Sequence, residues 1–296
     1  MLSPLSANLA RPRRSMLYMP ASNARVLDKA KTLAADALIF DLEDAVAPDA
    51  KADARTAAVF AADSRGYGQR EILIRANGIG TAWFKDDLTA IATSSADGVV
   101  LPKIDGPEDL RRADAVLSAA GAPNHLKIWA MMETPRGILA AEALAASTPR
   151  LAGFLMGTAD LSKDLHCAHP ADRAPMIYAL QHCVLVARAY GIAIVDGVHV
   201  DLEDAAGFEA ACLQGRDMGF DGKSLIHPKQ IEVANASFAP SANAVDYARR
   251  LVAAHAEAAA HGHAVTLLDG RLVEVLHVVQ AERLLAQAAL IAQLEA

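Results

Sequence analysis

The chain alternates between short apolar runs and longer stretches in which Ala, Leu and charged residues recur at helical spacing. Eight apolar runs occur between residues 15 and 227, and each ends in a polar residue, Gly or Pro. Runs of this kind predict strands buried on both faces, and the stretches between them predict crossover helices. The runs are Ser15–Pro20, Ala37–Asp41, Glu71–Asn77, Gly98–Lys103, Lys127–Glu133, Leu151–Gly157, Ile192–Gly197 and Gly222–His227.

Eight strand–helix units predict an α/β fold in which parallel strands close into a (β/α)₈ TIM barrel. An open doubly wound sheet is the alternative that the same pattern allows. The 296 residues exceed the roughly 250 of one such barrel. We therefore expect a catalytic barrel over 1–235 and a C-terminal helical extension over 236–296, with helices at 243–261 and 275–295 around a polar turn at 269–271. The extension would cover the barrel mouth or serve as a lid for a neighbouring subunit.

Composition and charge narrow the class of partner. Hydrophobic residues make up 53% and charged residues 21%, as in ordinary globular proteins. A net charge of -7 and a pI near 5.8 give no general attraction to nucleic acid. No apolar run approaches the roughly 20 residues of a membrane-spanning helix. We expect a cytoplasmic protein with a small-molecule partner, and neither nucleic acid nor membrane.

The cysteines and the N-terminus fit this interpretation. The three cysteines fit neither a disulfide framework nor a zinc motif, and we expect reduced thiols; they are Cys167, Cys183 and Cys212. The first fourteen residues carry three arginines, Arg13 and Arg14 among them, and no acid. This is faintly similar to a transit peptide, but prolines interrupt it, and we expect a frayed terminus.

Two acidic residues follow successive predicted strands, Glu133 after the fifth run and Asp160 after the sixth. The active site of a (β/α)₈ barrel lies at the carboxyl ends of its strands, so these carboxylates should face each other across the mouth. Two carboxylates, with water and substrate oxygens completing the shell, are typical of a Mg²⁺ site. The alternative, which position alone leaves equally open, is that each forms a structural ion pair.

Charged residues also follow the second and third runs. Arg75 suits a substrate carboxylate or a developing enolate or alkoxide oxygen, and its alternative is a salt bridge to Asp41 or Asp44. Asp41, Glu43 and Asp44 lie within four positions. We interpret Asp41 and Asp44 as groups that hold metal-bound water or orient Arg75. Helix capping with a pair to Lys51 or Arg55 is about as plausible.

The segment Gly157, Thr158, Ala159 and Asp160 offers backbone N–H groups that could hold a substrate carboxylate. Lys103 and His227 are weaker candidates, since a lone His after a strand is more often structural. The sequence contains no GxGxxG after a strand, no GxxxxGK[ST] and no GxSxG. Their absence disfavours a dinucleotide oxidoreductase, a P-loop enzyme and an α/β-hydrolase.

Ordered motifs along nearly the whole chain resemble the citrate lyase beta-subunit-like family of the malyl-CoA lyase and aldolase superfamily. No single piece is decisive, but the ordered set is highly specific. The segments are RSMLYMPAS at 14–22, DLEDAVAPDAKADAR at 41–55, ILIRAN at 72–77, VLPK at 100–103, METPRGI at 132–138, GTADLSKDL at 157–165, DGV at 196–198 and GFDGKSLIHPKQI at 219–231.

The resemblance implies a homo-oligomer, usually a trimer or hexamer, of barrels with a C-terminal extension. It implies Mg²⁺ on Glu133 and Asp160, with Arg75 and Glu133 touching the substrate. It also implies an acyl-CoA thioester and a 2-oxo acid as ligands, with Tyr18 and Lys29 as candidate coenzyme A contacts. Such a lyase would cleave a 3-hydroxyacyl-CoA into acetyl-CoA and a 2-oxo acid, or run the reverse condensation.

Two residues depart from the pattern of the family. Its catalytic acid/base is an Asp in the C-terminal extension, and the matching stretch DGRLVEVLH at 269–277 carries Glu274 instead. Where a Gly is common, this chain has His166, which we expect to reshape the acyl pocket. We expect a carbon–carbon lyase with Glu274 as acid/base. The alternatives are a hydrolase of the same thioesters, a non-catalytic 2-oxo-acid or acyl-CoA binding protein, and a subunit of a larger citrate lyase complex.

Overall fold

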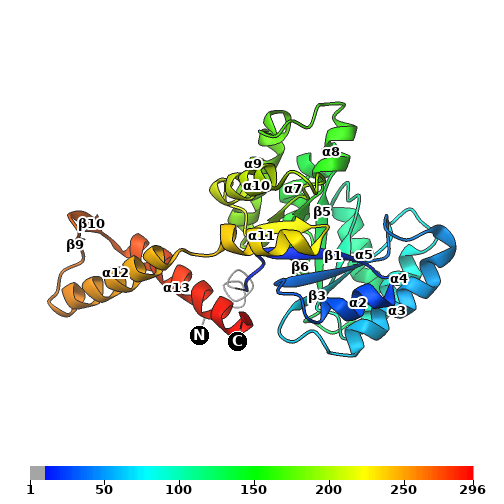
Figure 1. The fold of residues 1–296 in the computed structure, drawn as a ribbon, viewed down its shortest axis with the longest axis horizontal. Helices are drawn as coiled ribbons and strands as arrows, with labels where there is room; N and C mark the ends of the chain where they lie inside the picture. The colour runs from blue at the N-terminus through cyan, green and yellow to red at the C-terminus, as the bar shows by residue number, and fades with distance from the viewer. Residues whose placement is uncertain (1–10, 296) are drawn as a thin grey trace. The chain divides into compact units, whose positions relative to one another are not determined.

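The structure is a computed structural model that describes residues 11–295. Eight parallel strands form a closed barrel in sequence order, and pairing of the first strand with the eighth closes it (Figure 1). The predicted TIM barrel is therefore confirmed, and the open sheet is wrong. The strands are β1 (Ser15–Pro20), β2 (Ala37–Asp41), β3 (Glu71–Arg75), β4 (Gly98–Leu101), β5 (Lys127–Met132), β6 (Leu151–Met156), β7 (Ala193–Asp196) and β8 (Gly222–Leu225).

Helices follow the strands and surround the barrel, as Figure 1 shows. Side chains at helix starts accept backbone N–H groups, as in the caps that Asn23, Thr134 and Asp204 provide. After β5 the crossover consists of two short helices that meet at Ala140. The helices are α2 (Ala24–Ala30), α3 (Lys51–Asp63), α4 (Phe84–Ala92), α5 (Pro107–Ala119), α6 (Pro135–Leu139), α7 (Ala141–Ala145), α8 (Thr158–Asp164), α9 (Ile177–Tyr190), α10 (Ala205–Met218) and α11 (Ile231–Phe238), with 3₁₀ turns η1 (Pro48–Ala50), η2 (Ala174–Met176) and η3 (Pro228–Gln230).

Side chains along each strand point alternately into and out of the barrel. Those that point inward fill the interior, and those at the strand ends lie at the mouth. Ile39, Leu73 and Met131 belong to the buried cluster inside the barrel. Successive strand residues point to opposite faces, so residues two positions further along face the same interior. Asp41 and Arg75 occupy such positions at the ends of β2 and β3. The strand register therefore sets these charged groups directly above the apolar interior.

Arg13 and Arg14 are structural, so the expectation of a frayed terminus is wrong for them. Arg13 donates to Glu71 at 2.5 and 3.0 Å, and Arg14 donates to Asp36 at 2.8 and 2.9 Å. All four side chains are buried. These pairs link the start of β1 to the segments that precede or begin β2 and β3. Residues 1–10 lie outside the described part of the chain.

The chain divides into a barrel unit, Arg13–Phe238, and a second unit that contains the residues from Ala239 onward. The second unit contains α12 (Ala242–Ala260), an antiparallel hairpin of β9 (Thr266–Leu268) and β10 (Arg271–Val273), and α13 (Val275–Glu295). Asp269 and Gly270 form the hairpin turn with positive φ angles of 50° and 76°, as a type I′ turn requires. The sequence predicted the turn and the two helices but not the strands beside it.

Helix α13 corrects one expectation from the sequence. An 18-residue window of its 21 residues has a mean hydropathy of 1.3, and by length and composition alone α13 meets the requirements for a helix that crosses a membrane. The expectation that no run approaches this length is therefore wrong. Ala281 of α13 packs with Leu251 of α12 and with Val273. A cytoplasmic location stays a prediction.

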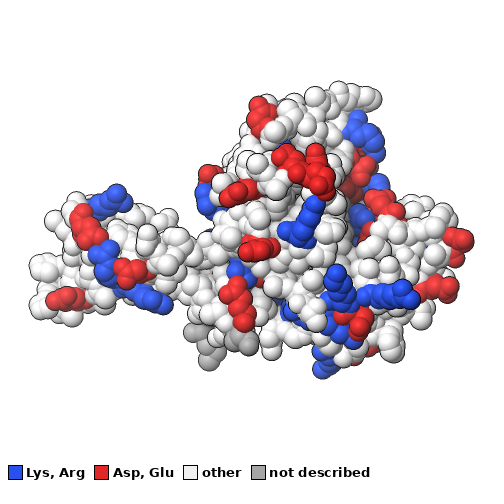
Figure 2. All heavy atoms as spheres, in the orientation of Figure 1, with Lys and Arg blue, Asp and Glu red and all other residues white. Residues whose placement is uncertain are grey.

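The surface in Figure 2 carries basic and acidic side chains interspersed with one another. A surface that binds nucleic acid requires a basic patch or stripe. No such stripe dominates the face in this view.

Candidate active site

A cavity of about 410 Å³ opens at the carboxyl ends of the strands, where a barrel enzyme binds its substrate. Its lining residues lie in or shortly after β1, β2, β3, β5, β6, β7 and β8. Nine of the predicted site residues line it: Tyr18, Asp41, Asp44, Arg75, Glu133, Gly157, Thr158, Ala159 and Asp160.

Arg75 lies among carboxylates at one side of this cavity. Its guanidinium donates to both oxygens of Asp41 at 2.7 Å and pairs with Glu43 at 2.9 Å and with Asp44 at 3.6 Å. The Tyr18 ring lies against the guanidinium, 4.9 Å from ring centroid to Cζ. Burial acts to lower the pKa of Arg75, but hydrogen bonding to Asp41 and the surrounding charges raise it overall. The guanidinium therefore stays charged and fixed in orientation.

The loop after β2 holds Asp41 in position for this pair. Asp41 accepts the backbone N–H groups of Glu43 and Ala45 at 2.8 and 3.1 Å. Lys51 donates its ammonium to the carbonyls of residues 42 and 43 at 2.7 and 2.6 Å. Arg55 pairs with the Asp87 side chain at 2.7 Å instead. Lys51 and Arg55 thus stabilise the surrounding backbone and helices, while Asp41 bonds Arg75.

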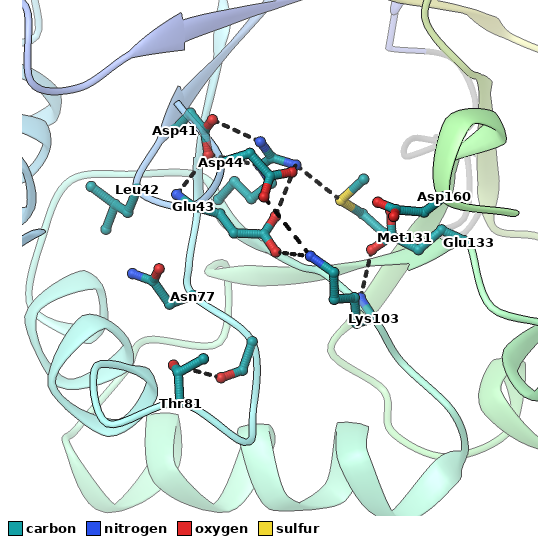
Figure 3. Close-up of polar contacts among 12 residues, drawn as sticks. Asp41, Leu42, Glu43, Asp44, Asn77, Thr81, Lys103, Met131, Glu133 and Asp160 are labelled. Carbon is teal, nitrogen blue, oxygen red and sulfur yellow. Dashed lines mark hydrogen bonds and ion pairs between the residues drawn. The ribbon is translucent and has the colours of Figure 1, made fainter. Parts of the chain in front are cut away.

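Glu43 and Lys103 connect the Arg75 group to Glu133, and neither was assigned a firm role from the sequence. The Lys103 ammonium forms a short ion pair with Glu43, and the Lys103 backbone N–H donates to Glu133 Oε1 at 2.6 Å (Figure 3). Lys103 has a φ of 52°, an unusual value for a residue with a side chain. The available signal was the strand-end position of Lys103 and the acidic context of Glu43.

Glu133 and Asp160 lie together across the cavity from Asp41 and Asp44, as Figure 3 shows. Glu133 is 2% exposed, and its pKa is raised to about 7. Burial is the largest cause, the charges of Glu43 and Asp160 add to it, and the N–H of Lys103 opposes it. A buried carboxylate of this kind binds either a proton or a cation near neutral pH.

Gly157 allows Glu133 to take this position. A Cβ at residue 157 would lie 2.3 Å from Glu133 Oε2 and 2.5 Å from Glu133 Cβ. Any residue other than glycine would collide with the carboxylate. The same glycine is the N-cap residue of α8, whose first residues, Thr158 and Ala159, line the cavity.

The charges around the cavity fit one divalent cation. Four carboxylates line the cavity, those of Asp41, Asp44, Glu133 and Asp160, and the cationic side chain among the lining residues is that of Arg75. With Glu133 ionised, the lining therefore carries more negative than positive charge. Within residues 11–295 there is no cluster of three or more His, Cys, Asp or Glu suited to a metal. A site with only two carboxylates fits Mg²⁺, which keeps several waters and substrate oxygens in its shell.

Several predicted residues lie away from this cavity. Lys29 is an exposed residue of α2, and His166 is in the loop after α8; neither lines the cavity. Glu274 belongs to the second unit, directly before α13. His227 accepts the backbone N–H of Lys229 at 3.1 Å at the start of η3, so it is a structural cap.

Comparison with known proteins is consistent with this geometry. The profile of the HpcH/HpaI aldolase/citrate lyase family matches residues 14–228. A (3S)-malyl-CoA thioesterase of Cereibacter sphaeroides is 48% identical over 290 residues, which cover 98% of this chain and 99% of the relative. An L-malyl-CoA/beta-methylmalyl-CoA lyase of the same species is 34% identical, covering 95% of this chain and 96% of the relative.

Among solved structures, the protein CitE from Mycobacterium tuberculosis in complex with magnesium, acetoacetate and coenzyme A superposes with a TM-score of 0.76. It is 29% identical, and the match covers 95% of this chain and 99% of that chain. Magnesium and coenzyme A are therefore ligands of a protein with this architecture.

The comparisons overturn the expectation of a carbon–carbon lyase. Thioesterases of Cereibacter sphaeroides are 46–48% identical to this chain along almost its full length, whereas the lyases of that genus are 34% identical. The alternative, a hydrolase of the same class of thioester, fits this pattern better. A barrel mouth that binds a metal-coordinated acid beside a thioester is compatible with either reaction, so the site motifs alone could not separate them.

Proposed function

The chain belongs to the HpcH/HpaI aldolase/citrate lyase family, and we propose that it is a thioesterase which hydrolyses a 3-hydroxyacyl-CoA of the (3S)-malyl-CoA type. The products would be the free hydroxy acid and coenzyme A. The observation that carries this proposal is the 48% identity to a (3S)-malyl-CoA thioesterase across 98% of the chain.

Glu133 and Asp160 would hold Mg²⁺ at the mouth of the barrel. When bound there, Mg²⁺ would act as a Lewis acid toward substrate oxygens and as a template for the hydroxy acid. The excess of carboxylates over cationic side chains among the lining residues supports this assignment. Solved relatives with magnesium support it independently.

The N-terminus of α8 would bind the free carboxylate of the acyl group. Thr158 and Ala159, its first residues, line the cavity beside Asp160, and the unpaired backbone N–H groups at the start of a helix bind anions well. Their position next to the proposed metal would place the hydroxyl and carboxylate of the substrate on one side. The thioester carbonyl would then point toward Arg75.

Arg75 would stabilise the negative charge that develops on the thioester oxygen when water adds to the carbonyl carbon. Its orientation is fixed by the two bonds to Asp41 and by the Tyr18 ring. A donor fixed before the reaction stabilises the transition state without reorganising. Removing one such donor typically lowers the rate by about 10²–10³-fold.

Hydrolysis also changes what is required of Glu274. A lyase needs a group that protonates the enolate carbon, and Glu274 was expected to fill this role. A thioesterase needs an attacking water and no group that protonates carbon, so a Glu in place of the usual Asp is compatible with hydrolysis.

Two further residues have supporting roles in this proposal. Tyr18 would act through Arg75, and Lys29 stays a candidate for contact with the phosphates of coenzyme A.

The test is to incubate the purified chain with Mg²⁺ and (3S)-malyl-CoA. We expect free thiol together with malate, measured with a thiol reagent and by chromatography. Arg75→Ala should lower this rate about 10²–10³-fold, whereas Arg111→Ala, an exposed arginine on α5, should not. Formation of acetyl-CoA and a 2-oxo acid, or no turnover at all, would contradict the proposal.

A further inference from the structure

A second cavity, of about 440 Å³, adjoins the proposed substrate cavity. Thr158, Ala159 and Val198 line both cavities and therefore form the dividing wall between them. Beyond this wall the second cavity extends over the segments that follow β6 and β7. None of the roles assigned above uses the second cavity.

Val198 is the part of the dividing wall that a removable side chain closes. Ala159 contributes only a methyl group, and Thr158 is 2% exposed at the start of α8. Val198 is half-buried and lies outside the helices and strands, two residues after the end of β7. Its isopropyl group can therefore be shortened without a change in α8.

The backbone on both sides of Val198 is held in place. The carbonyl of Gly197 accepts a hydrogen bond from Lys223 Nζ at 2.6 Å, and the carbonyl of His199 accepts one from Gln230 Nε2 at 3.0 Å. The effect of a smaller side chain depends on whether its surroundings can collapse into the space. Because these bonds fix the loop, a shorter residue at position 198 should open the dividing wall.

The proposed orientation of the substrate places one of its carbon atoms beside this wall. The hydroxyl and carboxylate of the acid would lie next to Thr158, Ala159 and the proposed metal, while the thioester points toward Arg75. Both groups are attached to the same carbon, whose third bond leads to the thioester and whose fourth substituent in malyl-CoA is hydrogen. Since Val198 adjoins Thr158 and Ala159, a larger fourth substituent would meet the Val198 side chain.

The charges around the second cavity favour an uncharged substituent. Lys223 and Arg173 are buried cations of its lining, and both bond Asp196, at 3.0 Å and at 2.7 and 2.8 Å. Asp201 and Asp204 also line the cavity, so it offers no excess positive charge to a further carboxylate. A buried carboxylate without a partner is costly. An alkyl group would instead meet the apolar part of the lining, which includes Pro170, Ala171, Val200 and Ala211.

We propose that Val198 is a specificity-determining residue, which limits the size of the substituent on the hydroxyl-bearing carbon of the acyl group. With a shorter side chain at this position, the second cavity receives an alkyl substituent and the site accepts 3-hydroxyacyl thioesters that are branched at this carbon. This inference rests on the proposed thioesterase function for the orientation of the acid.

The experiment compares malyl-CoA with two homologues that carry a propyl or a carboxymethyl group in place of the hydrogen on the hydroxyl-bearing carbon. Thiol release at saturating Mg²⁺ gives kcat/KM for each. Val198→Ala and Val198→Ser should raise kcat/KM for the propyl homologue by about tenfold or more, and that for the carboxymethyl homologue by less than about threefold.

Two control variants separate the opening of the wall from other effects of mutation. Val198→Thr keeps the branched shape of the side chain, and Val200→Ala shortens an exposed valine that lines only the second cavity. Neither should show the gain with the propyl homologue. Thermal unfolding checks that all variants are folded.

A binding measurement tests the same inference without turnover. Calorimetric titration of the Mg²⁺-loaded protein with malate and with 2-propylmalate, the free acids of two of the thioesters, gives their affinities. We expect Val198→Ala to raise the affinity for 2-propylmalate relative to malate by about tenfold or more.

Three outcomes would overturn the assignment: no gain with the propyl compounds in folded Val198→Ala and Val198→Ser, an equal gain in Val200→Ala, or a gain with the carboxymethyl homologue as large as that with propyl. Failure of the proposed function has a different signature. In that case wild type releases no thiol from malyl-CoA, or it forms acetyl-CoA and a 2-oxo acid, while the affinities for the free acids still report on Val198.

Discussion

The close approach of Gly157 to Glu133 gives the sharpest test of how the proposed metal ligand is positioned. An added Cβ at residue 157 would lie 2.3 Å from Glu133 Oε2 and 2.5 Å from Glu133 Cβ. Rotation of the Glu133 side chain could relieve the first contact. It could not relieve the second, because the backbone fixes the position of Cβ. Gly157→Ala must therefore separate the ends of β5 and β6.

The size of the effect follows from the cost of overpacking. Extra atoms in a well-packed site typically cost about 1–3 kcal/mol, and about 1.4 kcal/mol corresponds to a tenfold change in an equilibrium constant. If this cost falls on the metal-binding position of Glu133, Mn²⁺ affinity should drop by roughly 10- to 100-fold. Hydrolysis at limiting metal should fall with it.

Gly80→Ala is the matched control, since a Cβ there would meet no atom within 4 Å and the residue needs no positive φ. Mn²⁺ titration followed by electron paramagnetic resonance measures both variants, and thermal unfolding checks that they are folded. A Gly157→Ala protein that binds Mn²⁺ within about twofold of wild type would refute the reasoning.

Three further predictions follow from charged groups. Asp41→Asn should lower kcat/KM for thiol release by about 10- to 100-fold, because Arg75 loses charge-assisted bonds that contribute about 1.5–3 kcal/mol; an unchanged value would contradict its orienting role. Apparent Mn²⁺ affinity should rise with pH through about 7, because Glu133 must lose its proton to bind a metal; a flat titration series would argue against Glu133 as a ligand. Arg14→Met should lower the free energy of unfolding by about 3–5 kcal/mol in a denaturant titration, because it removes the buried partner of Asp36; a loss under about 1 kcal/mol would contradict this.

The choice between lyase and thioesterase shows where the recognisable motifs stop being informative. Both reactions would use the proposed metal, a hydroxy or 2-oxo acid and a coenzyme A thioester. The ordered motifs contain the residues that would bind these ligands, so they are the same for either reaction. The reaction is decided by whether a water and a base can reach the thioester carbon.

The amino-acid sequence by itself determined the barrel and which strand ends carry charge. Strands buried on both faces must be apolar throughout, so an Asp or Arg at the end of an apolar run stands out, and Asp41 and Arg75 were identified in this way. The C-terminal strands were missed because each has only three residues beside the Asp269–Gly270 turn, too few for a clear alternation.

Only the tertiary structure decided how the charged groups pair. Arg75 and Asp41 are 34 residues apart and Glu43 and Lys103 are 60 apart, and their contacts arise because strands β2, β3 and β4 are neighbours in the closed barrel. The shift in the pKa of Glu133 likewise comes from burial and from charges on segments that follow other strands. Local sequence fixes what a side chain can do, whereas its partners and solvent exposure depend on segments brought together by folding.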